Sequence, residues 1–209
     1  MTRAINVIFR ITIVGLSLAG CGTFSPRPDP SRFFTLSSLP QVAQASLKNS
    51  TGPEKMFLGI GPIKFPGYLD RQEIVVRSGQ NRFEVSEIDL WAEPLQENFS
   101  RVLSENLALL LNTDLIMIYP WSPANRPRYQ VEIEVLRLEA NSERNGQLSA
   151  RWSVLDDADK KVAVVKESRV IRNAQEKSTD GSVAALSEAV GDLSREIADA
   201  VGAIDGKRK

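Results

Sequence analysis

The chain has 209 residues, with 26 basic and 26 acidic side chains, one cysteine and no histidine. Since there is no basic excess, nothing in the composition indicates nucleic-acid binding. The absence of histidine removes the commonest general base and the commonest metal ligand, which excludes histidine-dependent catalysis.

The first twenty residues have the pattern of a secretory signal. Arg3 and Arg10 precede an apolar run, residues 11–20, that is shorter than the ~20 residues needed to span a bilayer. The run ends in Leu-Ala-Gly-Cys (18–21), which resembles the lipobox of bacterial lipoproteins. We therefore predict that residues 1–20 are cleaved and that lipid on Cys21 anchors the protein to a membrane.

The residues after Cys21 indicate where the protein goes and how it is tethered. In the Gram-negative lipoproteins that this segment resembles, Asp after the cysteine favours the inner membrane, so Gly22 predicts the outer membrane. Residues 21–31 hold three alternating prolines and predict an extended, lipidated tether. Residues 32–209 have the length of a single domain, which we expect to face the periplasm. Loss of Arg3 and Arg10 leaves 24 basic against 26 acidic side chains, a net charge of −2.

The first part of the domain reads as short strands joined by turns. Pro62 and Pro66 follow the second strand closely, so we expect that segment to be an edge or a bend. The strands are predicted at 32–36, 56–60, 74–77 and 82–85.

Two segments carry the 3.6-residue apolar period of amphipathic helices. The first follows Trp91, has Pro94 in its first turn and ends near Asn112. The second covers about 182–204, with Asp180 or Ser182 as a potential cap. Strands are predicted between the helices at 115–119, 129–138, 147–155 and 162–170, and the proline-rich segment 120–127 must be a loop.

The order of these elements predicts an α+β fold. Alternation in 129–138 gives one buried and one solvent-facing side of a sheet. Runs of strands with two long amphipathic helices predict a mostly antiparallel sheet with both helices packed on one face.

Several motifs of the mature chain occur in a characteristic order. Arg-Phe-Phe-Thr-Leu (32–36) follows the lipobox, and Gly-Ile-Gly-Pro-Ile-Lys-Phe-Pro-Gly-Tyr-Leu-Asp-Arg-Gln-Glu-Ile-Val spans 59–75. Leu-Trp-Ala-Glu-Pro-Leu (90–95) opens the first helix, and Tyr-Pro-Trp (119–121) closes the next strand. In this order the motifs resemble the PqiC-like family of ABC-type transport auxiliary lipoproteins.

The resemblance implies a non-enzymatic role in intermembrane lipid trafficking and membrane integrity. In such systems an inner-membrane protein with MCE domains builds a tunnel through the periplasm, and the lipoprotein meets that tunnel at the outer membrane. The implied partners are the MCE tunnel protein and its inner-membrane permease system. The chain has no phosphate-binding loop and so cannot be the motor. Homo-oligomerisation stays open.

The bend at residues 66–71 is the first candidate for a partner contact. Its prolines interrupt strand pairing, which leaves side chains to project, and a Tyr, a Leu and an Arg lie close together, as interfaces favour. The alternative is that Tyr68 and Leu69 pack under the bend while Asp70 and Arg71 pair locally. Trp91 is a further candidate, because Trp is enriched in interface hot spots, with a core position as its alternative. The loop 120–127 is the next region to test.

No enzyme motif is present in the sequence. A phosphate loop, GxSxG and HExxH are all absent, and the acidic run 155–161 predicts a hairpin turn, not a calcium loop. We therefore predict no catalytic residue, no metal and no cofactor. A carboxylate-based hydrolase is a formal alternative. The main alternative is an outer-membrane lipoprotein that activates a peptidoglycan synthase or assists outer-membrane assembly.

Overall fold

The computed structural model of the protein describes residues 29–40, 56–157 and 161–207. The signal peptide, Cys21 and most of the tether lie outside the described residues, so the expectations for them remain predictions. Residues Ser31–Lys209 form one unit, and it is this unit that carries the sheet and helices. None of the helices in the described ranges is long and apolar enough to cross a membrane.

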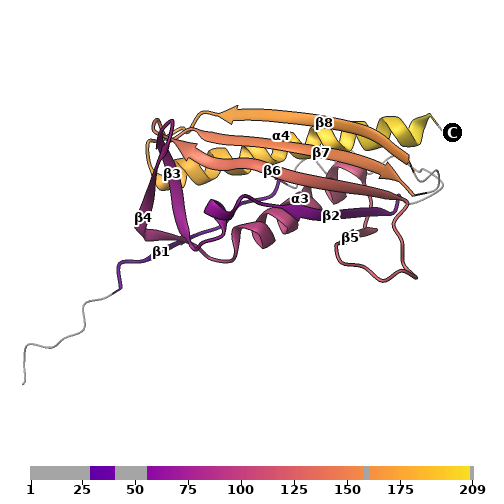
Figure 1. Cartoon of the computed structure of the whole chain (residues 1–209), viewed down its shortest axis with the longest axis horizontal. Coiled ribbons are helices and arrows are strands. Elements are labelled where there is room, and N and C mark those ends of the chain that lie inside the picture. The colour runs from indigo at the N-terminus through magenta and orange to yellow at the C-terminus, as the bar shows by residue number, and fades with distance from the viewer. Residues whose placement is uncertain (1–28, 41–55, 158–160, 208–209) are drawn as a thin grey trace, which may run out of the picture. The chain divides into compact units, whose positions relative to one another are not determined.

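The sheet is built around one long strand, β6 (Tyr129–Asn141). On one side, β6 pairs antiparallel with β7 (Gly146–Asp156), which pairs antiparallel with β8 (Lys161–Arg172). These long ladders form the upper part of the sheet in Figure 1. On its other side, β6 pairs parallel with β2 (Leu58–Lys64) along its first half, and β2 pairs parallel with β5 (Ile116–Ile118).

A second branch of the sheet leaves the far end of β6. There β6 pairs parallel with β3 (Glu73–Gly79), which forms an antiparallel hairpin with β4 (Arg82–Trp91). β1 (Arg32–Phe34) lies parallel beside β4. The longest ladders are antiparallel, as the sequence predicted, and the shorter parallel pairings were not predicted.

Both long helices cover the same face of the sheet. α3 (Leu95–Leu111) packs on β2 and β5, whereas α4 (Thr179–Gly206) packs on β6, β7 and β8, and the two helices also pack against each other. Figure 1 shows α4 running behind β7 and β8. The opposite face of the sheet, here called the open face, is turned toward the viewer, and no helix of the described residues covers it.

Helix stripes and alternating strand residues meet to form the core. Each fully buried Leu, Val or Phe side chain stabilises the fold by roughly 1.5–3 kcal/mol. The α3 stripe contributes Leu95, Phe99, Leu103 and Leu107, the α4 stripe contributes Leu186, Val190, Leu193, Ile197 and Val201, and β6 contributes Tyr129, Val131, Ile133 and Val135.

The fold confirms the predicted elements and their order, with one correction. The end of β2 that holds Pro62 is a local edge, as expected, because β5 pairs with β2 only up to Ile60 and β6 alone continues beside Ile63 and Lys64. The ladder tolerates Pro62 because the register to β6 shifts between Ile60 and Ile63. The α4 cap is neither Asp180 nor Ser182 but Ser178, whose Oγ accepts a 3.0 Å hydrogen bond from the Gly181 N–H.

Candidate functional site

The bend at residues 66–71 is tied into the fold by Tyr68. This residue lies in a single 3-10 turn, η2 (Gly67–Leu69), and its ring stacks on Phe83 of β4 with centroids 4.6 Å apart. Its hydroxyl donates a 2.6 Å hydrogen bond to Glu139 Oε2, and Arg77 Nε donates to Glu139 Oε1 at 2.7 Å. The Arg77 guanidinium also lies 4.3 Å from the centre of the Phe83 ring.

Buried Glu139 in this cluster is held by three hydrogen-bond donors. The Glu139 side chain is 0% exposed, so its charge depends on the two donors and on a 3.1 Å bond from the Leu138 N–H. Burial, followed by the hydrogen bond to Glu139, raises the pKa of Tyr68. Burial lowers the pKa of Arg77, but the hydrogen bonds and charges of Glu139 and Tyr68 together outweigh burial and leave that pKa raised. Tyr68 therefore stays a proton donor, and Arg77 stays a cation.

The other predicted contact residues divide between core and surface. Leu69 and Trp91 are 4% and 5% exposed and belong to the core, where a partner cannot reach them. The Trp91 backbone N–H donates to the Gln72 carbonyl at 2.7 Å, which places β4 beside the bend. Asp70 and Arg71 are exposed and line a small hollow at the start of α3. Among these predicted contact residues, only Asp70 and Arg71 are exposed, whereas Tyr68 is half-buried.

Two motifs that are sixty residues apart in the sequence meet at the β2–β5 end of the molecule. A Cβ at Gly59 would lie 2.5 Å from Pro127 Cγ and 2.8 Å from Trp121 Cη2, so both rings rest directly on the glycine backbone. Gly61 has φ +114°, a conformation that L side chains rarely adopt, and its Cβ position lies 2.8 Å from the Cβ of Tyr119. The two glycines therefore seat the Tyr119–Trp121 segment on β2.

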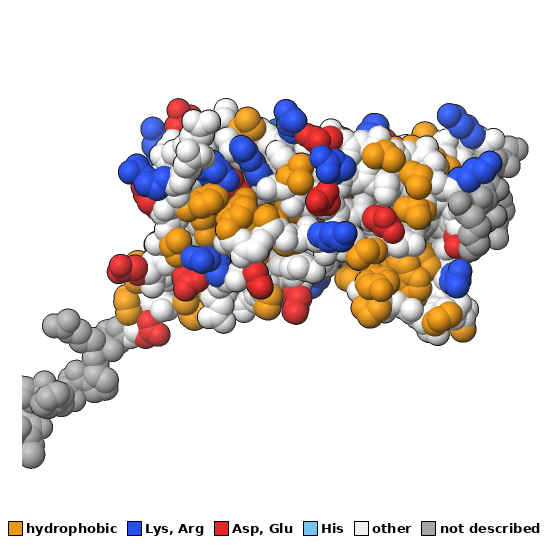
Figure 2. All heavy atoms as spheres, viewed as in Figure 1, with side chains coloured by type: hydrophobic (Ala, Val, Ile, Leu, Met, Phe, Trp, Pro, Cys, Tyr) orange, Lys and Arg blue, Asp and Glu red, His pale blue; other side chains and the backbone are white. Residues whose placement is uncertain are grey.

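Beside this packing, apolar residues of β5 and of the segments that flank it are exposed or half-buried; they are here named the β5 patch (Leu115, Ile118, Tyr119, Trp121 and Pro123). Leu115 and Ile118 are each 44% exposed and Tyr119 is 52% exposed. Tyr119 and Trp121 pack edge to face with centroids 5.4 Å apart. Figure 2 shows hydrophobic side chains gathered at the lower right, over β5 and the loop that follows it. A hollow beside the rings is lined by Arg126, Gln130 and Asp157.

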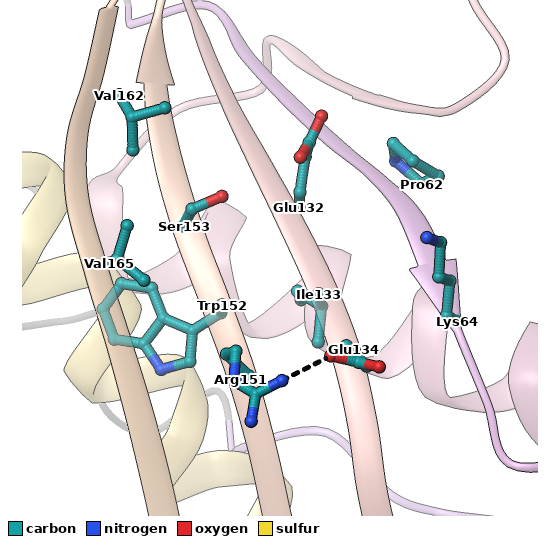
Figure 3. A pocket seen from close by; sticks show the side chains of 10 residues that line it. All are labelled: Pro62, Lys64, Glu132, Ile133, Glu134, Arg151, Trp152, Ser153, Val162 and Val165. Carbon is teal, nitrogen blue, oxygen red and sulfur yellow. Dashed lines mark hydrogen bonds and ion pairs between the residues drawn. The ribbon is translucent and has the colours of Figure 1, made fainter.

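The open face of the sheet holds a shallow depression of mixed character. Figure 3 shows Lys64 of β2 beside Glu132 and Glu134 of β6, with Arg151 of β7 donating to Glu134 at 3.0 Å. Ser153 also lines the depression, but the chain contains no histidine to activate it. Within residues 29–40, 56–157 and 161–207, no group of three acidic, Cys or His residues could hold a metal ion. The depression is a solvated, ion-paired surface.

Comparison with known protein families gives a match over most of the chain. Residues 34–198 match the model of the family described as "ABC-type transport auxiliary lipoprotein component". A comparison with curated proteins found no match.

Solved structures with the same fold include the crystal structure of an uncharacterized protein, with TM-score 0.65 and 15% identity, which covers 82% of this chain and 98% of that one. A second is a protein of Xanthomonas campestris from a family of unknown function, with TM-score 0.64 and 14% identity, which covers 85% of this chain and 100% of that one. At these identities the structures show the shared fold alone.

Proposed function

Because the chain belongs to the ABC-type transport auxiliary lipoprotein component family, we propose that it is a non-enzymatic, lipid-anchored component of an envelope lipid-transport system. The proposed partner is the MCE-domain tunnel protein of that system, working with its inner-membrane permease. The proposed location is the outer membrane, with the domain facing the periplasm. Binding, not chemistry, is then the task of the folded domain.

The β5 patch carries this proposal, because it exposes aromatic and aliphatic side chains to solvent. Tyr and Trp are enriched in interfaces relative to open surface, and Tyr119 and Trp121 pack against each other here. Gly59 and Gly61 of the 59–75 motif hold the rings of Trp121 and Tyr119 in place, so a motif that resembles the family also shapes this surface. The other predicted contact residues have structural roles: Leu69 and Trp91 pack in the core, and Tyr68 belongs to the Glu139 cluster (Tyr68, Arg77, Phe83 and Glu139).

The patch can be tested by capture of the MCE-domain protein from detergent-solubilised membranes. The double change Ile118→Ser with Tyr119→Ala removes two exposed side chains and leaves the backbone bond from the Tyr119 N–H to Ile60 O intact. We expect a folded protein whose yield of partner falls at least about tenfold, which corresponds to roughly 1.4 kcal/mol. Ile88→Ser, at a 39% exposed position of β4, is the matched control.

Unchanged capture by the patch variant would reject the β5 patch as the contact. Asp70 and Arg71 would then be the next surface to change, by Asp70→Ala with Arg71→Ala. Capture of a peptidoglycan synthase or an outer-membrane assembly protein in place of the MCE protein would support the alternative function.

The anchor and its location are tested separately. Cys21→Ser should abolish labelling by radioactive palmitate, since the thioether can no longer form. Wild-type protein should fractionate with the outer membrane on a sucrose gradient, and Gly22→Asp should move a substantial share to the inner membrane. Equal labelling of Cys21→Ser and wild type would contradict the lipobox interpretation, and wild type in the inner-membrane fraction would contradict the location.

A further inference from the structure

Strand β8 is a long, accessible edge of the sheet. It has 12 residues, and within the described part of the chain it pairs only with β7. The edge strands β5 and β1 have three residues each, too short to offer a ladder. A strand edge of this length presents a row of backbone groups that can template another strand. In Figure 1, β8 forms the upper rim of the sheet, on the side away from β5.

The side chains of β8 alternate between the two faces of the sheet. Ser168 is buried under α4, where its Oγ accepts from Trp152 Nε1 at 2.9 Å and donates to Glu196 Oε2 at 2.6 Å. The open face carries four residues that are paired with β7 residues of that face: Val165, Glu167, Arg169 and Ile171. Val165 and Ile171 are 66% and 63% exposed, which is unusual for large apolar residues on an otherwise ion-paired surface.

We propose that β8 pairs antiparallel with β8 of a second copy of this chain, about a two-fold axis at Ser168. The order Val165, Glu167, Ser168, Arg169, Ile171 is complementary to its own reverse. In this register Val165 lies opposite Ile171 of the second copy, and Glu167 lies opposite Arg169 of the second copy. Each pair occurs twice. On the open face, the four exposed apolar side chains cover one another and the four charges are matched.

Neighbouring registers fail on charge. Directly opposed residues of the two β8 strands must point to the same face of the joined sheet. The two-fold axis must therefore pass through a single residue of β8, and the nearest alternatives to Ser168 are Glu167 and Arg169. Moving the axis by one residue places Glu167 opposite Glu167, or Arg169 opposite Arg169. Like charges directly opposite are destabilising. The Ser168 register is the one that avoids both clashes and also joins the apolar pairs.

The pairing also continues a row of charges that already crosses the sheet. Arg151 of β7 contacts Glu134 of β6 at 3.0 Å and Glu167 of β8 at 3.6 Å. Within the single chain, Arg169 folds back on Glu167 at 2.7 Å and is 78% exposed. In the paired state Arg169 of the second copy takes the next place in the row, so acid and base alternate across three strands and the interface.

Complementary charge variants test the pairing, with full-length protein in detergent studied by sedimentation velocity. Arg169→Glu alone and Glu167→Arg alone each place two like-charge pairs across the axis, so each should dissociate at least about tenfold more readily than wild type. A mixture of the two variants should form a mixed dimer, because every opposed pair in it is again acid against base. Arg137→Glu, an exposed position of β6 with the same charge change, should leave the dimer intact.

Three outcomes would overturn the proposal. If wild-type protein stays monomeric at all concentrations, the dimer does not exist. If Arg169→Glu and Arg137→Glu weaken the dimer equally, β8 is not its interface. Failure of the two folded variants to associate when mixed would reject the Ser168 register. Because the β5 patch lies on the other edge of the sheet, partner capture by these variants should be unchanged, which separates this proposal from the proposed function.

Discussion

Replacing Tyr68 by Phe removes a single hydroxyl group and keeps the ring that stacks on Phe83. The hydroxyl donates a 2.6 Å hydrogen bond to Glu139, whose side chain is fully buried. A hydrogen bond to a charged group contributes about 1.5–3 kcal/mol, and the buried carboxylate cannot recover the lost donor from water. Arg77 and the Leu138 N–H continue to bind the carboxylate, so the loss should stay within that range.

The expected change is large enough to measure in a domain of this size. At about 2–4 °C per kcal/mol, the melting temperature of Tyr68→Phe should fall by roughly 3–12 °C. Urea unfolding followed by circular dichroism gives the free energy directly. Arg77→Met should destabilise the protein more, by about 3–5 kcal/mol, because it leaves the buried Glu139 charge without a cation. Arg77→Met combined with Glu139→Leu should recover part of that loss.

The same variant decides whether Tyr68 is a contact residue. The structure assigns it to the Glu139 cluster, so Tyr68→Phe should capture the MCE-domain protein as wild type does. A change of less than about 0.5 kcal/mol, the range of ordinary surface substitutions, together with lost capture, would refute the assignment and return the bend to the candidate interface.

Two further predictions follow from the hydrogen bonds and the close packing. Burial raises the pKa of Asp89, but bonds from Thr179 and Arg32 outweigh burial and hold the pKa below its usual value. The stabilisation that ionised Asp89 gives the fold is present above the unfolded pKa of about 3.9 and is lost as the pH falls through the lower folded pKa. The urea midpoint of unfolding should therefore decrease when the pH is lowered below about 4. The decrease should be smaller in Asp89→Asn. Gly59→Ala should destabilise by about 1–3 kcal/mol as Pro127 and Trp121 are displaced, whereas Gly202→Ala, with open space around it in α4, should stabilise by about 0.5–1 kcal/mol; equal melting temperatures would contradict the packing argument.

Periodicity predicted most of the fold because the helices and the long strands each have one buried face. Residues 129, 131, 133 and 135 alternate as the sequence indicated, and both helical stripes are core. The alternation then breaks, because a register shift lies between Val135 and Arg137, and Leu138, Glu139 and Ala140 are all buried. A sequence pattern does not reveal where such a bulge occurs, so the buried position of Glu139 could not be foreseen.

The candidate site was harder to predict because its parts are distant in sequence. Tyr68 and Glu139 are 71 positions apart, and an exposed tyrosine looks the same in sequence as one that donates to a buried carboxylate. Likewise, the motifs at 59–75 and 119–121 pointed to the family without indicating that Gly59 and Gly61 seat the rings of Trp121 and Tyr119. Two glycines in alternate positions of a strand were the available signal, since they allow another segment to approach closely.

Site-specific photo-crosslinking in intact cells tests the central claim most directly. A photoreactive amino acid at position 119 places the probe in the β5 patch, and the same probe at position 88 samples an exposed apolar position on β4. Irradiation should join the protein to the MCE-domain tunnel protein from position 119 and not from position 88. Equal adducts from both positions, or an adduct from position 119 with a peptidoglycan synthase and none with the tunnel protein, would contradict the account.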